Sequence, residues 1–321
     1  MDPLLLLSLI LAFYVAWSVG ANDETMAPLA GIGLMGVTAV ALVGALADFA
    51  GALAVSGAVE KTLGVKLLTF RATERDVFVI LFATATWLVV ASYKGWPVST
   101  THSAVGAAIG LALAKRGLEG INVETLNSVV GGWVFSPLAG VVGAYLTSLI
   151  IDRLYRARAN KGLVLDLKLF RAAALILFFW SAYTAFFRGG NDVANATAFL
   201  LVVSPNPAAV KVVCAVGVAL GLLVLGRRVI KNVGNELVEL DPLTGISVQM
   251  SVALVLSIGT LLGFPLSGTH VLVSAVAGVG LARRVWINTR GLKEIVGTWI
   301  ATFPGAAVIS IVVEEILAAF S

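Results

Sequence analysis

The sequence predicts an all-α integral membrane protein, and three observations support this fold class. Of its 321 residues, 59% are hydrophobic and only 12% are charged, and the mean hydropathy is +0.98. Soluble domains contain about 25% charged and about 45–50% apolar residues. The apolar residues also gather in runs near the ~20 residues that a helix needs to cross a bilayer. Finally, these runs occur in two similar sets.

Most of the apolar runs are typical of single membrane helices, but several are not. The runs cover residues 4–21, 27–57, 77–93, 126–151, 172–187, 208–226, 246–263 and 295–320. Residues 27–57 are too many for one upright span, whereas residues 104–114 and 271–282 are too few to cross alone. Short apolar pieces beside Gly, Pro, Ser and Thr are typical of half-helices in re-entrant hairpins, which exist only where protein or water surrounds the irregular backbone. We therefore expect about 10–12 membrane segments, re-entrant half-helix hairpins included.

The composition excludes several classes of function. Cys214 is the single cysteine, which excludes an internal disulfide and a cysteine-based metal site. The net charge of +4 does not indicate nucleic-acid binding, because the Lys and Arg residues lie in short loops between apolar runs. The N-terminal stretch "MDPLLLLSLILAFYVAW" has no basic start and no small-residue cleavage site, so we expect a retained membrane helix. The predicted location is the cell membrane, with multiple crossings, and no cofactor is predicted.

Three ordered matches show that the chain contains two copies of one unit. "GANDETMA" (20–27) matches "GGNDVANA" (189–196), "PVSTTHS" (97–103) matches "PLSGTHV" (265–271), and "INVETLNSVVGGW" (121–133) matches "INTRGLKEIVGTW" (287–299). We expect residues 1–151 to form the first transmembrane repeat and residues 172–321 the second. Two copies with interrupted helices at corresponding positions indicate a transporter binding site between the repeats. An odd number of crossings per copy would invert the second copy, and an even number would leave the copies parallel.

Residues 152–171, "DRLYRARANKGLVLDLKLFR", are expected to form a linker loop between the repeats. They include six basic and two acidic residues. Because cytoplasmic loops carry an excess of Lys and Arg, we expect this loop on the cytoplasmic side.

The hydroxyl-rich clusters "PVSTTHS" and "PLSGTHV" have the composition of a half-helix start, in which a proline precedes capping residues. Unpaired backbone N–H groups and the helix dipole favour an anion at such a start. Two starts that face each other could hold one tetrahedral oxyanion. The candidate substrate-binding residues in these clusters are Ser99, Thr100, Thr101, Ser267, Gly268 and Thr269.

The carboxylates of Asp23 and Asp192 conflict with a nearby anion unless a cation accompanies it, because burying unpaired charge costs several kcal/mol. The clusters themselves contain no Lys or Arg, and we expect Arg188 and Lys94 to lie at helix ends and snorkel to the interface. Carboxylate, amide and carbonyl oxygens suit Na⁺ or a proton. We therefore predict that the Asn-Asp pairs bind Na⁺, or take up H⁺, beside the anion, so that charge neutrality couples the two. The candidate cation-binding residues are Asn22, Asp23, Asn191 and Asp192.

Four other residues are possible accessories to this site. His102 and His270 occupy matching positions, and we favour a neutral, hydrogen-bonding role at the hairpin tips over a proton relay. Asp48 has Gly217 as its counterpart, so the repeat gives it no support. Glu24 could add a carboxylate to the first cluster or point into an aqueous vestibule.

At these residues the sequence resembles the inorganic phosphate transporter (PiT) family of cation-coupled phosphate symporters. The resemblance is carried by "GANDETMA", "GGNDVANA", "PVSTTHS", "PLSGTHV" and "KNVGNELVELDPLTG" (231–245), which together span nearly the whole chain. It implies two inverted-topology repeats, a homodimer, and phosphate bound between paired re-entrant hairpins with Na⁺ or H⁺ beside it. It places Asn195 in the substrate site and Asp48 where the family often has a membrane-embedded glutamate.

The motifs depart from the family pattern at three positions. Met26 stands where the family usually has an amide, which Asn195 retains in the second copy. Glu24 replaces an apolar residue, and Gly268 stands where threonine is common.

The sequence thus predicts a secondary-active symporter of inorganic phosphate, coupled to Na⁺ or H⁺, that works by alternating access and is not an enzyme. A sulfate or other oxyanion permease on the same scaffold is the alternative. An intramembrane hydrolase with Ser267, His270 and Asp192 as a triad is a remote alternative, because an asymmetric catalytic site needs only one copy. An ion channel is a third possibility.

Overall fold

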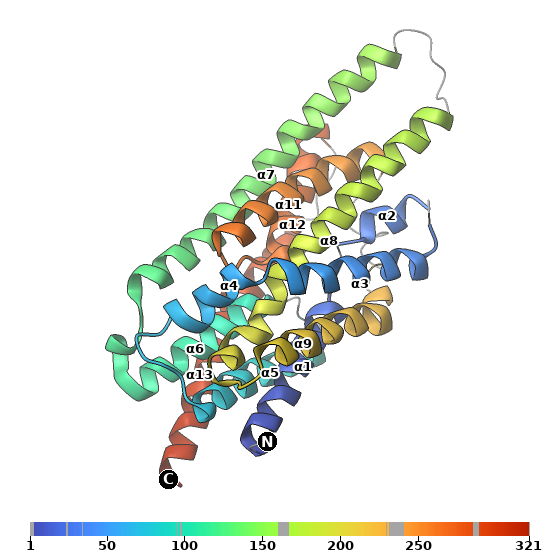
Figure 1. Ribbon diagram of the computed structural model, residues 1–321. Helices are drawn as coiled ribbons and strands as arrows, with labels where there is room; N and C mark the ends of the chain where they lie inside the picture. The colour runs from blue at the N-terminus through green and yellow to red at the C-terminus, as the bar shows by residue number, and fades with distance from the viewer. Residues whose placement is uncertain are drawn as a thin grey trace.

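The computed structural model describes residues 3–23, 25–33, 35–94, 96, 98–159, 167–228, 230, 241–284 and 289–320. Within these residues the chain is almost entirely helical, as Figure 1 shows, and Leu68 and Ile121 form one isolated β-bridge. Seven of the described helices are long and apolar enough to cross a membrane. The prediction of an all-α, multi-pass membrane protein is confirmed.

The first half of the chain contains six α-helices before its long terminal helix and two short turns of other helical type. In order they are α1 (Pro3–Ala21), α2 (Ala27–Gly31), α3 (Val37–Ala54), α4 (Gly57–Lys61), the π-helical turn η1 (Thr62–Lys66), α5 (Glu74–Lys94), α6 (Thr100–Arg116), the 3₁₀ turn η2 (Gly117–Gly120) and α7 (Val123–Ala159). The apolar run at 27–57 is therefore divided among α2, α3 and the start of α4, in agreement with its excessive length.

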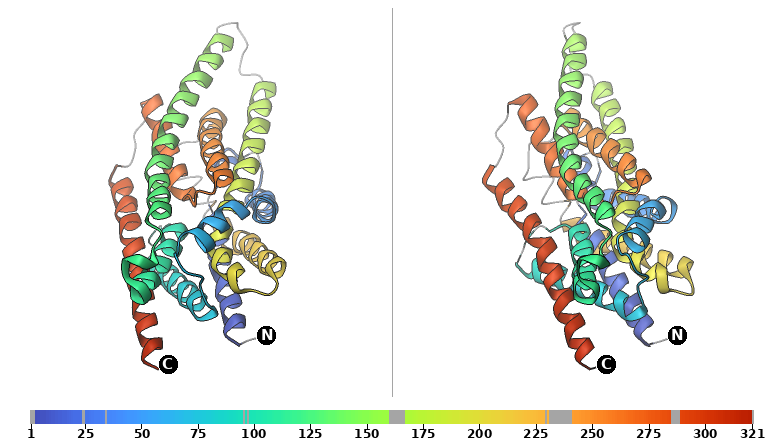
Figure 2. Two further views of the ribbon diagram at one scale, coloured as in Figure 1. Left: turned by 60° about the vertical axis from the view of Figure 1, so that its left-hand side comes forward. Right: turned by 90° about the vertical axis from the view of Figure 1, so that its left-hand side faces the viewer.

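The second half contains α8 (Leu167–Val203), α9 (Pro207–Gly221), the π-helical turn η3 (Leu222–Gly226), α11 (Pro242–Leu262), α12 (Gly268–Arg283) and α13 (Thr289–Ala319). The long helices α7 and α8 both extend toward one end of the molecule, with α11 packed against each of them, and both chain termini lie at the opposite end (Figure 2). Both helices extend into the expected linker loop at 152–171, since α7 continues to Ala159 and α8 begins at Leu167.

Local sequence signals fix the ends of α11 and the approach to α12. Asp241 caps α11, because its carboxylate accepts a hydrogen bond of 2.7 Å from the Thr244 backbone N–H, and Pro242 follows at the first helical position. Gly263 ends the helix in the left-handed conformation with φ +80°, which glycine adopts without steric cost. The chain then runs without helix through residues 264–266 to Ser267 and begins α12. This turn is the tip of the second hairpin.

The half-helices α6 and α12 are short and largely buried by the rest of the protein. At 17 and 16 residues they span about 24–26 Å at 1.5 Å per residue, less than the ~30 Å hydrocarbon core. The expectation that residues 104–114 and 271–282 belong to half-helices agrees with these bounds.

The helix packing recurs when the two halves are exchanged. Helix α6 packs on α13, the last helix of the second half, and α12 packs on α7, the last helix of the first half. In the same way α3 packs on α8, and α1 packs on α9. Each half therefore buries its surfaces against the other half, and the hairpin tips are brought to a common centre. The boundaries and the inverted orientation of the two repeats stay predictions.

Candidate functional site

The two hairpins begin their helices with the same cap. Ser99 precedes α6, and its hydroxyl accepts a hydrogen bond from the His102 backbone N–H at 3.3 Å. Ser267 precedes α12, and its hydroxyl accepts from the His270 backbone N–H at 3.4 Å. Each serine satisfies one of the unpaired N–H groups of its helix and leaves the others at the tip as donors. Two helix N-termini of the predicted kind are thus present at matching positions.

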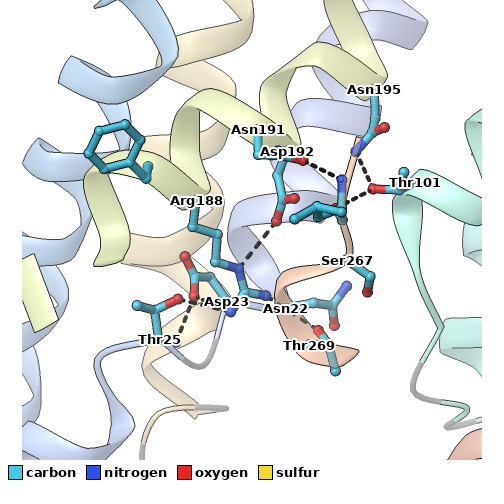
Figure 3. A network of polar contacts seen from close by, with 12 residues as sticks. Asn22, Asp23, Thr25, Thr101, Arg188, Asn191, Asp192, Asn195, Ser267 and Thr269 are labelled. Carbon is cyan, nitrogen blue, oxygen red and sulfur yellow. Dashed lines mark hydrogen bonds and ion pairs between the residues drawn. The ribbon is translucent and has the colours of Figure 1, made fainter. Parts of the chain in front are cut away.

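Two polar side chains join the two hairpin tips and the second Asn-Asp motif (Figure 3). The Thr101 hydroxyl donates to the Leu266 carbonyl at 3.0 Å and accepts from the Asn195 amide at 3.1 Å. The other end of the Asn195 side chain, its carbonyl oxygen Oδ1, is buried and has no hydrogen-bond partner within the described part of the chain. Buried polar atoms are nearly always hydrogen-bonded. An amide oxygen without such a bond therefore indicates a position where a cation could bind.

Asn191 holds the tip of the second hairpin in place. Its Nδ2 donates to the Thr260 hydroxyl and to the Phe264 carbonyl, each at 2.9 Å, and its Oδ1 accepts from the Leu266 backbone N–H at 3.0 Å. The side chain is fully buried. These three bonds tie α8 to the loop between α11 and α12.

The two Asn-Asp motifs have different backbones. In the first, α1 ends at Ala21, and Asn22 and Asp23 lie in a turn that leads to α2. In the second, helix α8 continues unbroken through Asn191 and Asp192 to Val203. The expectation of interrupted helices at corresponding positions is therefore wrong for the second Asn-Asp motif. Residues 188–200 contain no proline and only two glycines, and a packed helix tolerates glycine. The helix therefore continues through the second motif.

Arg188 does not lie at a helix end, where the sequence predicts it. It lies well inside α8, it is only 5% exposed, and it does not snorkel to an interface. Its Nη1 lies 3.1 Å from Asp23 Oδ1, and its Nε lies 3.2 Å from Asp192 Oδ2 (Figure 3). One guanidinium thus bridges the carboxylates of both motifs. The prediction that no Arg compensates the aspartates is wrong, because the residue four positions before Asp192 points along the same helix face.

The same guanidinium reaches three further features of the site. Its Nη1 donates to the Thr25 hydroxyl at 2.8 Å, and its Nη2 donates to the Thr269 hydroxyl at 3.4 Å. If residue 268 had a Cβ atom, that atom would lie 2.7 Å from the Nε of Arg188. Arg188 therefore lies against the first turn of α12, at the hairpin start predicted to bind the anion.

Asp48 contributes a third carboxylate at the centre of the molecule. It is completely buried in α3, where the Asp23 carboxyl group lies close to it, and no donor among the described residues is hydrogen-bonded to either of its oxygens. The charged groups that act on it are Asp23, Arg188 and Asp192. Helix α3 reaches α8 so closely because Gly189 has no side chain: a Cβ there would lie 2.4 Å from the Asp48 Cα. Three acidic side chains thus surround one basic side chain at this position.

The two histidines meet behind the hairpin tips. Their ring centroids are 4.7 Å apart, and His270 stacks on Trp299 at 3.5 Å, while His102 lies 3.9 Å from the ring of Trp133. His102 Nδ1 lies 3.3 Å from the Trp299 carbonyl oxygen. Among the described residues, His102 thus has the backbone partner that a hydrogen-bonding role needs, whereas the His270 ring contacts other rings. The choice between that role and a proton relay stays a prediction.

Two polar residues that the sequence analysis did not select also belong to the site. Thr25 accepts from Arg188, and its backbone N–H donates to Asp23 Oδ1 at 2.7 Å. Gln249, fully buried in α11, donates to the Thr25 carbonyl, and its Oε1 has no partner. Thr25 lies within the first motif and could have been found there, whereas Gln249 has no motif around it.

The other predicted residues differ in what surrounds them. Asn22 is exposed, and its Nδ2 donates to the Ser18 carbonyl at 2.9 Å. Thr100 is the first residue of α6 and is partly buried. Met26 is 1% exposed and packs among apolar side chains, so it does not enter the polar network. Glu24 and residues 231–240 of the family stretch lie outside the described residues.

The hydrolase triad does not form. Asp192 pairs with Arg188, Ser267 caps a helix, and the His270 Nε2 has no hydrogen-bond partner. Among the described residues there is no group of three or more His, Cys, Asp or Glu side chains that could hold a metal ion. A cation at this site would thus need hydroxyl, amide or backbone oxygens in addition to carboxylates.

The geometry agrees with what comparison with known proteins shows. A profile described as "Phosphate transporter family" matches residues 19–310, which include both motifs and both hairpins. The chain belongs to the phosphate transporter family. As expected for this family, it is a transporter and not an enzyme.

Individual family members are similar over nearly the whole of this chain. A Pyrococcus abyssi protein named "Putative phosphate permease" is 30% identical, with 99% of this chain and 98% of that protein covered. The Arabidopsis thaliana "Inorganic phosphate transporter 2-1, chloroplastic" is 27% identical, with 95% of this chain and 70% of that protein covered. A solved structure, "The sodium-dependent phosphate transporter", superimposes with a TM-score of 0.87 at 26% identity and covers 99% of this chain and 100% of its own.

Proposed function

We propose that this phosphate transporter family member symports inorganic phosphate with Na⁺ by alternating access of the site between the two hairpins. The observation that carries the proposal is the convergence of two capped helix N-termini on a cluster of three carboxylates and one guanidinium. The helix N-termini and the Ser and Thr hydroxyls favour an oxyanion. The surplus of carboxylates favours an accompanying cation.

The cation is proposed to bind among the carboxylates of Asp23, Asp48 and Asp192, where Arg188 holds two of the three and the oxygens of the third accept no hydrogen bond from a described residue. Asp48 supplies two unpaired oxygens, and Asp23 lies near enough to Asp48 to act on it. The unpaired Oδ1 of Asn195 lies farther along α8, beside Thr101 of the first hairpin. A negative site of this kind repels phosphate when it is empty and admits it when Na⁺ is bound, because each added positive charge offsets the repulsion. The electrostatic attraction between Na⁺ and phosphate then couples the binding of the two ions, and no separate structural element is needed. The name of the superimposable solved structure, a sodium-dependent transporter, supports Na⁺ over H⁺.

Uptake by proteoliposomes tests this proposal. The purified protein is reconstituted, and uptake of radiolabelled phosphate is followed with an inward Na⁺ gradient, an inward proton gradient, or neither. We expect saturable uptake that requires the Na⁺ gradient and resists an excess of unlabelled sulfate. Strong sulfate uptake without phosphate uptake would contradict the substrate assignment, and uptake driven by the proton gradient alone would reassign the coupling ion. Unsaturable uptake would favour a channel.

A homodimer is proposed from the family resemblance alone. Native mass spectrometry of the protein released from detergent checks it, and a mass that corresponds to one chain at all concentrations would contradict it.

A further inference from the structure

Arg188 is the only described side chain that contacts both Asn-Asp motifs and a hairpin start. Its guanidinium is bound to Asp23 and Asp192 on one side and reaches the Thr269 hydroxyl with Nη2 on the other. It is therefore a cation of the protein itself, and it occupies carboxylates that the proposed function assigns to Na⁺. This raises the question of what Arg188 does when Na⁺ and phosphate arrive.

Exchange of the two halves shows that Arg188 and Gly268 form a matched pair. The position that corresponds to Arg188 in the first half is Val19, and the position that corresponds to Gly268 is Thr100. Compared with the first half, the second half therefore has an arginine in place of the valine and a glycine in place of the threonine. The structure gives the physical reason, because any Cβ at position 268 would collide with the Arg188 Nε at 2.7 Å. Gly268 provides the space in which the guanidinium lies against the α12 N-terminus.

We propose that Arg188 is a tethered counter-cation of the transport site, held by Asp23 and Asp192 when phosphate is absent and turned to the phosphate when Na⁺ takes its place on those carboxylates. The proposal rests on the proposed function. Nη2 already faces Thr269 in the first turn of α12, so a short rotation of the long side chain brings the fork to an oxyanion seated there. Planar guanidinium donors match the oxygens of phosphate, and each charge-assisted bond is stronger than a neutral one.

If Na⁺ displaces Arg188 from the carboxylates, removal of Arg188 should change the Na⁺ affinity and the phosphate affinity in opposite directions. Because the guanidinium competes with Na⁺ for carboxylates, its loss tightens Na⁺ binding in the absence of phosphate. Because it also supplies donors to phosphate, its loss weakens phosphate binding. The two affinities therefore move in opposite directions, whereas loss of a structural clamp weakens both.

The experiment compares Arg188→Gln with the wild-type protein by two measurements. Na⁺ affinity without phosphate is read from the Na⁺-dependent rise in melting temperature of the detergent-solubilised protein. Phosphate KM is read from proteoliposome uptake at saturating Na⁺. We expect phosphate KM to rise by about 10-fold or more and half-saturating Na⁺ to fall by a similar factor. Arg116→Gln is the matched control, since this exposed arginine lies at the end of α6 and contacts the ring of Phe70; both constants should stay at wild-type values.

Further variants keep the test decisive if Arg188→Gln does not fold. Arg188→Lys keeps the charge but not the fork, so we expect a smaller rise in phosphate KM and little change in Na⁺ affinity. Gly268→Thr alone should lower uptake, because it displaces the guanidinium. Arg188→Val with Gly268→Thr installs the residues of the first half, removes the collision, and should reproduce the opposite shifts of Arg188→Gln.

The outcomes separate this inference from the proposed function. Absence of phosphate uptake by the wild-type protein under every gradient would contradict the proposed function. Wild-type uptake together with unchanged constants in Arg188→Gln, or with both affinities weakened, would overturn the inference alone. Failure of all Arg188 variants to fold would identify the residue as a structural clamp and overturn it as well.

Discussion

In the first half of the chain the Asn-Asp pair lies in a turn between α1 and α2, whereas in the second half the same pair lies in the middle of α8. The nearest difference in sequence with a structural consequence is Pro28, which corresponds to Thr197. Proline lacks the N–H for an intrahelical bond and collides with the carbonyl four residues before it, so Pro28 disfavours a continuous helix from the first motif into α2 and is tolerated in the first turn of α2. Thr197 is helical, and its hydroxyl donates to the Val193 carbonyl at 3.2 Å.

The two copies of the repeat therefore contribute different side chains and different backbone structures to the site. The first copy supplies a turn with Asp23 and Thr25, together with the buried carboxylate of Asp48. The second copy supplies a rigid helix that presents Arg188 and Asp192 on one face. The hairpin caps, in contrast, remained equivalent. Substitutions at corresponding positions can therefore break or sharpen the comparison.

The largest effect is expected from Asp192→Asn and Asp23→Asn. Each change removes a carboxylate partner of Arg188 and a negative charge that the proposed Na⁺ coupling requires. We expect Na⁺-dependent phosphate uptake to fall by roughly 10–100-fold in both variants, the loss typical of a charged hydrogen bond. Initial rates in proteoliposomes, normalised to the amount of folded protein, measure this. Wild-type rates with unchanged Na⁺ dependence would show that the motifs are structural only.

Asp48→Asn tests a carboxylate that only the first copy has, since its counterpart is Gly217. Burial of a carboxylate without a hydrogen-bond partner is costly, so its neutral replacement should raise the melting temperature measured without Na⁺. The same variant should lose most of the stabilisation by Na⁺, because a ligand that binds the folded state stabilises it only while its site exists.

Thermal unfolding in detergent with and without NaCl checks both parts. The exposed carboxylate of Glu119 provides the control, and Glu119→Gln should behave as wild type. Undiminished Na⁺ stabilisation in Asp48→Asn would place the cation elsewhere.

Met26→Asn restores the amide that the second copy has at Asn195, yet we expect it to be harmful. Met26 is buried among Leu29, Val40 and Leu222, away from the polar network. An amide there would lack partners and should destabilise the protein by about 1–3 kcal/mol without improving Na⁺ affinity. Chemical denaturation and Na⁺ titration measure the two quantities. A gain in Na⁺ affinity would mean that position 26 can turn toward the site.

The smallest effects are expected from the two hairpin caps. Ser99→Ala and Ser267→Ala each remove one cap, which typically costs about 1 kcal/mol. Because the caps are equivalent, the variants should lower phosphate uptake to comparable degrees. Uptake that depends on only one serine would indicate that the hairpins play unequal roles.

The sequence predicted the membrane class and the fold features that depend on local chemistry. Run lengths and the duplicated motifs identified the helices, the hairpins and their serine caps, because hydrophobic length and capping residues are local signals. The repeat offset also brought both Asn-Asp pairs into one hypothesis, and the structure joins them through Arg188.

The sequence could not show what depends on packing across the molecule. Arg188 is followed by two glycines and a change of composition, which is typical of a helix end, so only the tertiary structure shows that α8 continues and buries the guanidinium. Gln249 lies in an apolar helix with no motif, and it reaches the site only because α11 packs on α8 and α2. The burial of Met26 likewise follows from its contact with Gly44 on α3.

The crossed partnership of α6 with α13 and of α12 with α7 also constrains biogenesis. The ribosome completes α6 at Arg116 long before it reaches Thr289, where the helix that covers α6 begins. The first re-entrant helix must therefore wait in the translocation machinery or in a provisional arrangement until the final membrane helix arrives. Separation of the two halves would remove the long helix that covers each hairpin helix and leave α6 with α5, and α12 with α11, as partners.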